Sequence, residues 1–295
     1  MSDNRGGPAG GRASAGASGG HNLMVRLASA VILAPAVLIC TYVGGWVFLT
    51  LCGLAACVVL WEWTCLVANR PDARILAPGW AGLVSATLLI GFDWLDLAVT
   101  TAAVGAVVAA VGAAIWPVAR DRLAPTWAAG GVVYAATILF GPALLRRDPQ
   151  WGLTALLFLF ATVWMTDIFA FFCGRAIGGP LLCPRISPKK TWAGAIGGLI
   201  GGVAAGIGVA YASGVGQLGI VGVMGFVLSV LSQAGDLFES AVKRRFGAKD
   251  ASHLIPGHGG LMDRIDGFIF AAIAALLIGM FHQGTAAPGR GLLIW

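Results

Sequence analysis

Nine long apolar segments, separated by short polar stretches, constrain the fold of this chain more than any other feature of its sequence. A helix needs roughly 20 apolar residues to cross a bilayer core about 30 Å thick, and its backbone hydrogen bonds must be satisfied internally. The alternating segments of about 10 residues that form membrane β-barrels do not occur. The sequence therefore predicts an all-α, polytopic membrane helix bundle with about nine transmembrane helices. The predicted helices cover residues 27–43, 45–68, 76–92, 95–117, 126–144, 151–172, 192–212, 217–242 and 267–282.

Composition excludes the soluble alternatives. Hydrophobic residues make up 58% of the 295-residue chain and charged residues only 11%, whereas a soluble domain carries about 25% charged residues. Disordered, fibrous and disulfide-framework proteins are excluded on the same grounds. The net charge of +6 would suggest a nucleic-acid partner in a soluble protein. In a membrane protein it indicates positively charged cytoplasmic loops, so we expect no nucleic-acid partner.

The positions of the basic residues predict the orientation. If the N-terminus is cytoplasmic, all but three of the 19 Lys and Arg residues fall in cytoplasmic segments, and the exceptions are Arg146, Arg147 and Arg290. The positive-inside rule therefore selects nine spans with the N-terminus inside and the C-terminus outside. We expect a multi-pass protein of the cell (inner) membrane whose active site lies on the cytoplasmic side.

The chain divides into four regions by composition. Residues 1–21, rich in Gly, Ala and Ser, are expected to form a disordered cytoplasmic tail. Residues 22–150 hold the N-terminal transmembrane helices, and residues 151–285 hold a C-terminal catalytic transmembrane region with cytoplasmic loops. Residues 286–295 form a short C-terminal tail.

Glycines recur every four residues in the seventh predicted span, at positions 194, 198, 202 and 206. A phosphate-binding loop would require a Gly-rich turn that ends in Lys-Ser or Lys-Thr, and none is present here. The spacing instead favours close packing against another helix.

Carboxylates and basic residues cluster in two predicted cytoplasmic loops. Asp236 and Lys243 share one helix face with Gln233 and Ser240, and Asp263 and Asp266 are three residues apart at the start of the last span. Converging carboxylates suit Mg²⁺, which takes oxygen ligands and bridges to substrate phosphates. Taken singly, the basic run that starts at Lys243 fits a topogenic flank, and the two later aspartates fit acids at a helix N-terminus.

Glu62 lies inside the second predicted span. A charged group there is costly, so we expect it to pair with a polar neighbour within the bundle. A direct role in a site is the less favoured interpretation.

The segment 240–266 resembles the signature of phosphatidate cytidylyltransferases, also called CDP-diacylglycerol synthases. The matching residues are Ser240-Ala-Val-Lys243-Arg244, Lys249-Asp250, Ser252, Ile255-Pro256, His258-Gly259-Gly260 and Asp263-Arg264-Ile-Asp266. The elements S-P-K-K-T at 187–191 and D-x-x-A-F-F-x-G-R at 167–175 resemble the same family. The resemblance covers roughly residues 160–270, and the N-terminal half is similar only in hydropathy. Ala193 departs from the family, which commonly has an acid at that position.

The resemblance implies the reaction CTP + phosphatidate → CDP-diacylglycerol + pyrophosphate in phospholipid biosynthesis, by metal-assisted in-line attack. It implies Mg²⁺ as cofactor, with a monovalent cation such as K⁺ as a candidate to share the site. Partners are then CTP, phosphatidate and the bilayer, and a homodimer is an expectation from the family alone. The implied metal ligands are Asp236, Asp263 and Asp266, which with Lys243 form the expected catalytic set. The expected substrate-binding residues are Ser187, Lys189, Lys190, Ser240, Arg244, Lys249, Asp250, His258, Gly259, Gly260 and Arg264.

Two other classes of membrane protein remain alternatives. CDP-alcohol phosphotransferases carry D-G-x-x-A-R, but the sequence after Asp266-Gly267 is Phe-Ile-Phe and lacks the Ala-Arg. A lipid or ion transporter would have its charged site near the midplane, with broken helices paired between two halves. The polar residues of this chain instead gather in loops on one predicted face.

Overall fold

A computed structural model describes residues 31–115, 124–252, 254 and 259–295. Within these residues, eight helices are long and apolar enough to cross a membrane. They are α2 (Gly45–Ala68), α3 (Ala73–Gly91), α4 (Leu95–Ile115), α5 (Ala124–Arg146), α6 (Gly152–Ile177), α7 (Trp192–Ala212), α8 (Leu218–Arg245) and α9 (Met262–Gln283). The predicted all-α, polytopic membrane fold is confirmed. The first predicted span is helical over its described part, Val31–Val43, and its beginning lies outside the described residues, as does the predicted disordered tail.

Several helices extend beyond their predicted ends, and the added residues include charged ones. Helix α9 was predicted from residue 267 but begins at Met262, and α6 continues past residue 172 to Ile177. The added turn of α9 contains Asp263, Arg264 and Asp266. A hydropathy pattern ends where charges begin, whereas the helix continues as long as its backbone is satisfied. Asp263, Arg264 and Asp266, which the sequence predicted as site residues, therefore lie in the first turns of a helix rather than in a loop.

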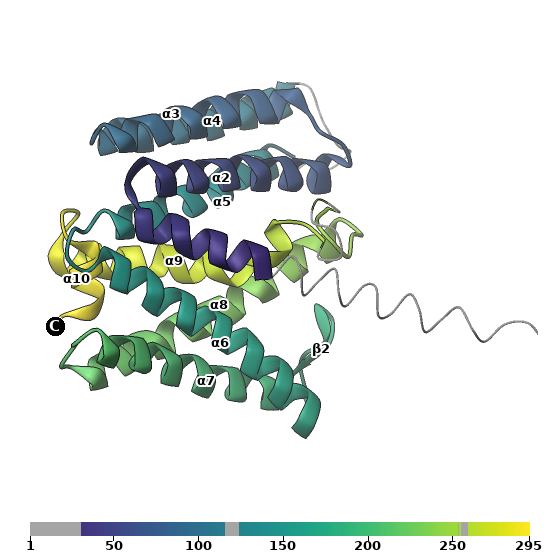
Figure 1. Ribbon diagram of the computed structural model, residues 1–295. Coiled ribbons are helices and arrows are strands. Elements are labelled where there is room, and N and C mark those ends of the chain that lie inside the picture. The colour runs from purple at the N-terminus through teal and green to yellow at the C-terminus, as the bar shows by residue number, and fades with distance from the viewer. Residues whose placement is uncertain (1–30, 116–123, 253, 255–258) are drawn as a thin grey trace, which may run out of the picture.

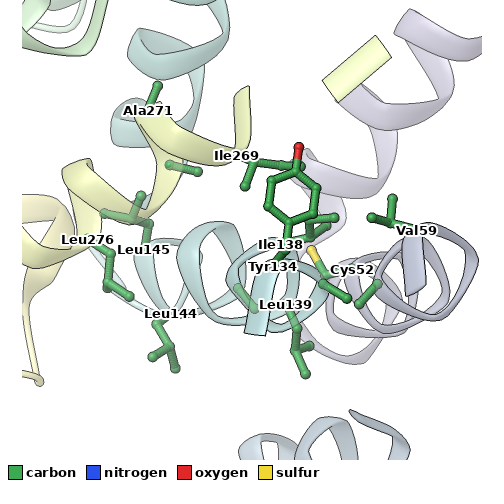
Figure 2. Packing of buried hydrophobic residues seen from close by; sticks show 14 of the residues in the cluster. Cys52, Val59, Tyr134, Ile138, Leu139, Leu144, Leu145, Ile269, Ala271 and Leu276 are labelled. Carbon is green, nitrogen blue, oxygen red and sulfur yellow. The ribbon is translucent and has the colours of Figure 1, made fainter. Parts of the chain in front are cut away.

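The helices pack in layers around α9, as Figure 1 shows. The α3–α4 pair lies at one side, α2 and α5 follow, and α6, α7 and α8 lie on the other side of α9. Figure 2 shows Tyr134, Ile138 and Leu139 of α5 packed between Cys52 and Val59 of α2 and the side chains of α9. Helix α5 thus joins the N-terminal helices to the central helix.

A two-stranded hairpin precedes α7, where the sequence predicted only a loop. Strand β1 (Leu181–Cys183) pairs antiparallel with β2 (Ser187–Thr191). The Thr191 hydroxyl accepts the backbone N–H of Gly194 at 3.1 Å and caps α7 directly after the hairpin. The hairpin therefore places Ser187, Lys189 and Lys190 on a strand of fixed direction.

The opposite end of the bundle carries the short helix α10 (Pro288–Leu293), which packs against α9 (Figure 1). The three arginines that run against the positive-inside pattern, Arg146, Arg147 and Arg290, lie at this end. Arg146 donates to the backbone carbonyls of Thr41 and Tyr42, and Arg147 forms an ion pair with Asp93. Arg146 and Arg147 therefore both stabilise contacts between segments at this end of the bundle.

The glycines of α7 allow the close contact with α6 that their spacing predicted. A Cβ on Gly198 would lie 2.6 Å from the carbonyl oxygen of Thr166, and one on Gly202 would lie 2.8 Å from that of Thr162. The backbones of the two helices therefore approach closely along this stripe. The predicted packing role is confirmed.

This contact predicts different effects for two glycines of the same helix. Gly202→Ala should lower the melting temperature in detergent, because overpacking a filled contact costs about 1–3 kcal/mol. Gly208→Ala is the matched control, since nothing lies within 4 Å of a Cβ there. That change should leave the melting temperature unchanged or raise it, because Ala favours helix over Gly by about 0.5–1 kcal/mol. Equal melting temperatures for the two variants would contradict the close α6–α7 contact.

Candidate functional site

Carboxylates from three helices gather at the end of the bundle that carries β2, the end of α8 and the start of α9 (Figure 1). Asp167 comes from α6, Asp236 and Glu239 from α8, and Asp266 from α9. Asp266 interacts electrostatically with the other three, so they form one acidic cluster. The sequence predicted this convergence for Asp236, Asp263 and Asp266, and Asp263 meets Glu239 of the cluster through Lys243. The sequence analysis did not identify Glu239 as a site residue, although its position one turn from Asp236 on the same helix face could have indicated it.

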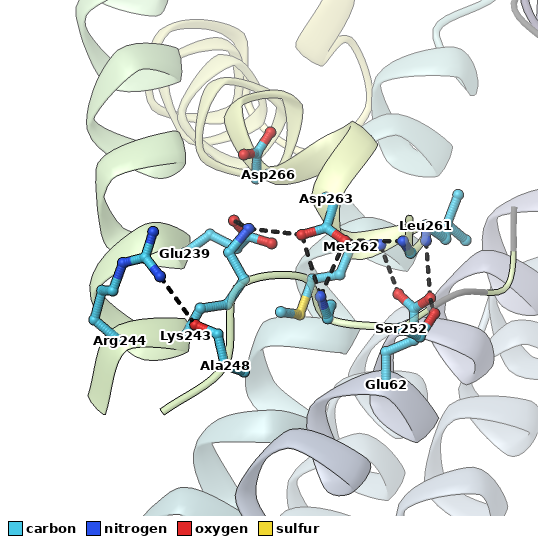
Figure 3. Close-up of polar contacts among 12 residues, drawn as sticks. Glu62, Glu239, Lys243, Arg244, Ala248, Ser252, Leu261, Met262, Asp263 and Asp266 are labelled. Atoms are coloured by element: carbon cyan, nitrogen blue, oxygen red, sulfur yellow. Dashed lines mark hydrogen bonds and ion pairs between the residues drawn. The ribbon is translucent and has the colours of Figure 1, made fainter. Parts of the chain in front are cut away.

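Lys243 lies between two carboxylates, as Figure 3 shows. Its Nζ is 2.5 Å from Glu239 Oε2 on its own helix and 2.6 Å from Asp263 Oδ1 on α9. The side chains are almost closed to solvent, with exposed fractions of 12% for Lys243, 1% for Glu239 and 7% for Asp263. A buried ion pair contributes specificity of geometry more than stability, while loss of one partner is costly. Lys243 therefore fixes the end of α8 against the start of α9.

Asp263 also holds the loop that leads into its own helix. Its Oδ2 accepts the backbone N–H of Ala251 at 3.0 Å and that of Gly260 at 2.8 Å. Gly259 has a φ of +85°, and a Cβ there would lie 2.9 Å from Oδ2 of Asp263. Glycine is required at this position for both reasons. The backbone at Gly259 and Gly260 thus approaches a carboxylate of this chain, and its predicted approach to a substrate phosphate stays a prediction.

Glu62 of α2 contacts the same loop from the other side. It is fully buried, and its carboxylate accepts the Ser252 hydroxyl at 2.6 Å and the backbone N–H groups of Leu261 and Met262 at 2.8 and 2.6 Å. The expected polar neighbour is therefore the start of α9 together with its preceding loop. Periodicity along one helix cannot reveal such a partner, because it lies 190 to 200 positions away in sequence.

The hairpin is joined to the acidic cluster by an ion pair between Lys190 of β2 and Asp236 of α8. Side chains alternate along a strand, so the neighbouring Lys189 points to the other face and is exposed. Ser187 is half-buried on the same strand. The two lysines therefore differ in their surroundings, although the sequence predicted the same role for both.

The other predicted substrate-binding residues differ in their exposure to solvent. Arg244, Lys249, Asp250 and Arg264 are exposed, whereas Ser240 is half-buried. Arg244 donates to the carbonyl of Ala248 at 3.3 Å, and Arg264 interacts electrostatically with Asp167. His258 lies outside the described residues.

The acidic cluster has oxygens suited to a hard cation. Neither Glu239 oxygen accepts a hydrogen bond of normal geometry, although Lys243 lies at ion-pair distance, and the buried Tyr134 hydroxyl nearby also lacks a partner. Asp266 Oδ1 accepts the N–H of Gly267 at 2.8 Å. The described part of the chain contains no ready-made group of three His, Cys, Asp or Glu ligands. Mg²⁺ commonly uses only one or two carboxylates together with water and substrate phosphates, so the residues present fit this ion.

The buried position of Lys243 predicts a large effect on stability. Lys243→Ala should destabilise the protein by about 3–5 kcal/mol, because it leaves two buried carboxylates without their cation. Lys249→Ala is the control, since Lys249 is exposed and surface substitutions usually change stability by less than about 0.5 kcal/mol. Thermal unfolding in detergent compares the two variants. A melting temperature of Lys243→Ala within one degree or so of the control would contradict the buried pairing.

A family model and individual relatives both identify the same family for this chain. Residues 24–281 match the family described as "Cytidylyltransferase family". The chain is 44% identical over 269 residues to the phosphatidate cytidylyltransferase of Brucella suis, an alignment that covers 90% of this chain and 97% of that protein.

Two further relatives carry the same name. The phosphatidate cytidylyltransferase of Haemophilus influenzae is 32% identical over 276 residues, which covers 83% of this chain and 94% of that protein. That of Bacillus subtilis is 39% identical over 130 residues, covering 43% and 47% of the two chains. The similarity to the Haemophilus influenzae protein extends through the N-terminal helices as well as the segment around the acidic cluster.

Proposed function

This chain belongs to the cytidylyltransferase family, and from that premise we propose that it transfers the cytidylyl group of CTP to phosphatidate, releasing pyrophosphate. The product is CDP-diacylglycerol, and the enzyme is a nucleotidyltransferase of phospholipid biosynthesis. The 44% identity over 90% of the chain carries this proposal. The acidic cluster at one end of an apolar bundle supports it, because a lipid headgroup and a soluble nucleotide meet where a membrane ends.

The carboxylates alone cannot support this reaction, because the substrates are also negatively charged. A phosphatidate oxygen attacks the α-phosphorus of CTP, and the bond to the pyrophosphate oxygen breaks as charge moves onto the leaving group. Both substrates are anions, and the cluster formed by Asp167, Asp236, Glu239 and Asp266 would repel them. A bound Mg²⁺ would offset this charge and stabilise the attacking and leaving oxygens. Catalysis in such transfers consists mainly of positioning and electrostatic stabilisation.

We propose that the three aspartates differ in how they serve this site. Asp236 and Asp266 present oxygens to the acidic cluster and would hold the metal directly. The acceptor positions of Asp263 are already used by Lys243, Ala251 and Gly260, so it would ligate only after Lys243 moves and otherwise positions the loop. A monovalent cation such as K⁺ would occupy a second position among the same oxygens.

Basic residues around the cluster are the proposed contacts for substrate phosphates. Lys190 would exchange Asp236 for a phosphate when substrates bind, and the exposed Arg244, Lys249 and Arg264 add donors. Ser187, Ser240 and Asp250 stay proposed substrate contacts. We also propose that this end faces the cytoplasm, where CTP is available, as the placement of basic residues predicts. The homodimer stays a prediction from the family.

The proposed activity predicts a metal-dependent reaction in detergent micelles. Purified protein should convert phosphatidate to CDP-diacylglycerol and pyrophosphate with CTP, should lose this activity after chelation, and should regain it with Mg²⁺. Asp236→Asn and Asp266→Asn should each lower kcat by at least about a hundredfold, roughly 2.7 kcal/mol of transition-state stabilisation. Asp263→Asn should lower both kcat and the melting temperature, because it also weakens contacts within the chain. Near-parental turnover of Asp236→Asn and Asp266→Asn at saturating Mg²⁺ would reject the ligand assignment.

The hairpin predicts unequal roles for its two lysines. Lys190→Gln should lower kcat/KM for CTP or phosphatidate about ten- to a hundredfold, the usual effect of losing a hydrogen bond to a charged group. Lys189→Gln, on the other face of the strand, is the matched control and should have a smaller effect. Steady-state kinetics with each substrate varied in turn gives the comparison. Equal values of kcat/KM for the two variants would show that the ion pair with Asp236 does not identify the substrate-facing lysine.

A further inference from the structure

We propose that Glu62 is a positioning residue for cytidylyl transfer, acting from α2 on the start of α9 and the loop before it. The inference rests on the proposed function for its kinetic consequence but on the structure for its contacts. Nothing in the chemistry of the substrates requires a carboxylate here, and Glu62 belongs to none of the motifs that the sequence resemblance covers. Its role follows from what it holds.

Glu62 supplies the cap that α9 does not supply for itself. The residue at the N-cap position of α9, Leu261, has no side-chain hydrogen bond to the first turn. One oxygen of Glu62 accepts the N–H of Leu261 at 2.8 Å and the other that of Met262 at 2.6 Å. An anion at a helix N-terminus interacts favourably with the free N–H groups and the helix dipole. A carboxylate from a distant helix thus does what Ser, Asp or Asn does in an ordinary cap.

Ser252 and Gly260, which precede α9, both lie against this carboxylate. The Ser252 hydroxyl donates to Glu62 Oε1 at 2.6 Å. A Cβ on Gly260 would lie 2.6 Å from the same oxygen, so any larger residue at position 260 would require the Glu62 carboxylate to shift. Figure 3 shows Glu62, Ser252, Leu261 and Met262 meeting in one group of hydrogen bonds.

Glu62 and Asp263 hold the same loop from two sides. Asp263 accepts from Ala251 and Gly260, and Glu62 accepts from Ser252 and Leu261, which are the next residues along the chain in each case. Release of the Glu62 contacts would therefore free the first turn of α9, which carries Asp263 and, one turn later, Asp266. A displacement of about 1 Å at a reacting centre costs on the order of a hundredfold in rate.

Glu62→Gln tests this role with little change in shape. One oxygen becomes an NH₂ group that faces a backbone N–H, so at least one cap bond is lost. We expect kcat to fall about ten- to a hundredfold, while KM for CTP changes by less than about threefold, because Glu62 is fully buried and both its oxygens bind groups of the protein itself. Ser252→Ala removes one donor and should lower kcat in the same direction by less. The double variant should lower kcat by less than the product of the two single effects, since both act on one contact.

Thr64→Val is the matched control. Thr64 is fully buried on the same helix, but its hydroxyl donates within α2, to the carbonyl of Leu60 at 2.7 Å. It should retain the parental kcat. If Thr64→Val and Glu62→Gln lower kcat equally, the effect belongs to the packing of α2 and the proposal is wrong.

Hydrogen exchange separates this inference from the proposed function. In intact protein, the amides of Leu261 and Met262 should exchange faster in Glu62→Gln, while those of α6 and α7 stay at the parental rate. Absence of CTP-dependent activity in the parental protein would reject the proposed function and leave this measurement valid. Parental exchange at both amides would overturn the role of Glu62 whatever the activity. If Glu62→Gln does not fold, Ser252→Ala decides, and a parental kcat with parental exchange in that variant would overturn the proposal.

Discussion

The burial of negative charge at the end of an apolar bundle is the constraint on which the rest of this structure depends. Glu62, Glu239 and Asp263 are almost closed to solvent, and an ionised carboxylate in such surroundings must be hydrogen-bonded or paired. These contacts join different helices: Glu62 joins α2 to the start of α9, and Lys243 joins α8 to α9. The geometry of the acidic cluster therefore follows from how these charges are compensated.

Helix α9 lies at the centre of the bundle, and the residues that compensate the buried charges hold its first turn in place. Helix α9 packs against α5 and α8 along its apolar length, and its polar first turn is held by residues of α2, α8 and its own preceding loop. The hairpin completes the arrangement by the Lys190–Asp236 ion pair. Substrate phosphates and a cation would thus meet groups already oriented by contacts within the protein, which lowers the reorganisation needed during reaction.

Much of this fold could be predicted from the sequence because bilayer thickness imposes a length on apolar segments, and the helices after the first were identified within a few residues. The small-residue spacing of α7 likewise predicted its contact with α6. The hairpin was missed because Pro188 and two lysines obscure any strand pattern in 187–191. The particular partners of Glu62, and the contact of Lys243 with Asp263, could not be predicted for a different reason: tertiary packing sets them, and no local period encodes it.

The distance in sequence between Glu62 and its partners has a consequence for biosynthesis. Ser252 and Met262 follow Glu62 by 190 and 200 positions, and at about 5–20 residues per second the ribosome needs on the order of 10–40 s to make that stretch. During this interval α2 enters the membrane with a carboxylate whose final partners do not yet exist. The nascent protein must hold that acid near water, or against a temporary partner, until the last span arrives. Insertion of α9 is then the step that supplies these partners, and a chain truncated before Ser252 would keep a carboxylate without them.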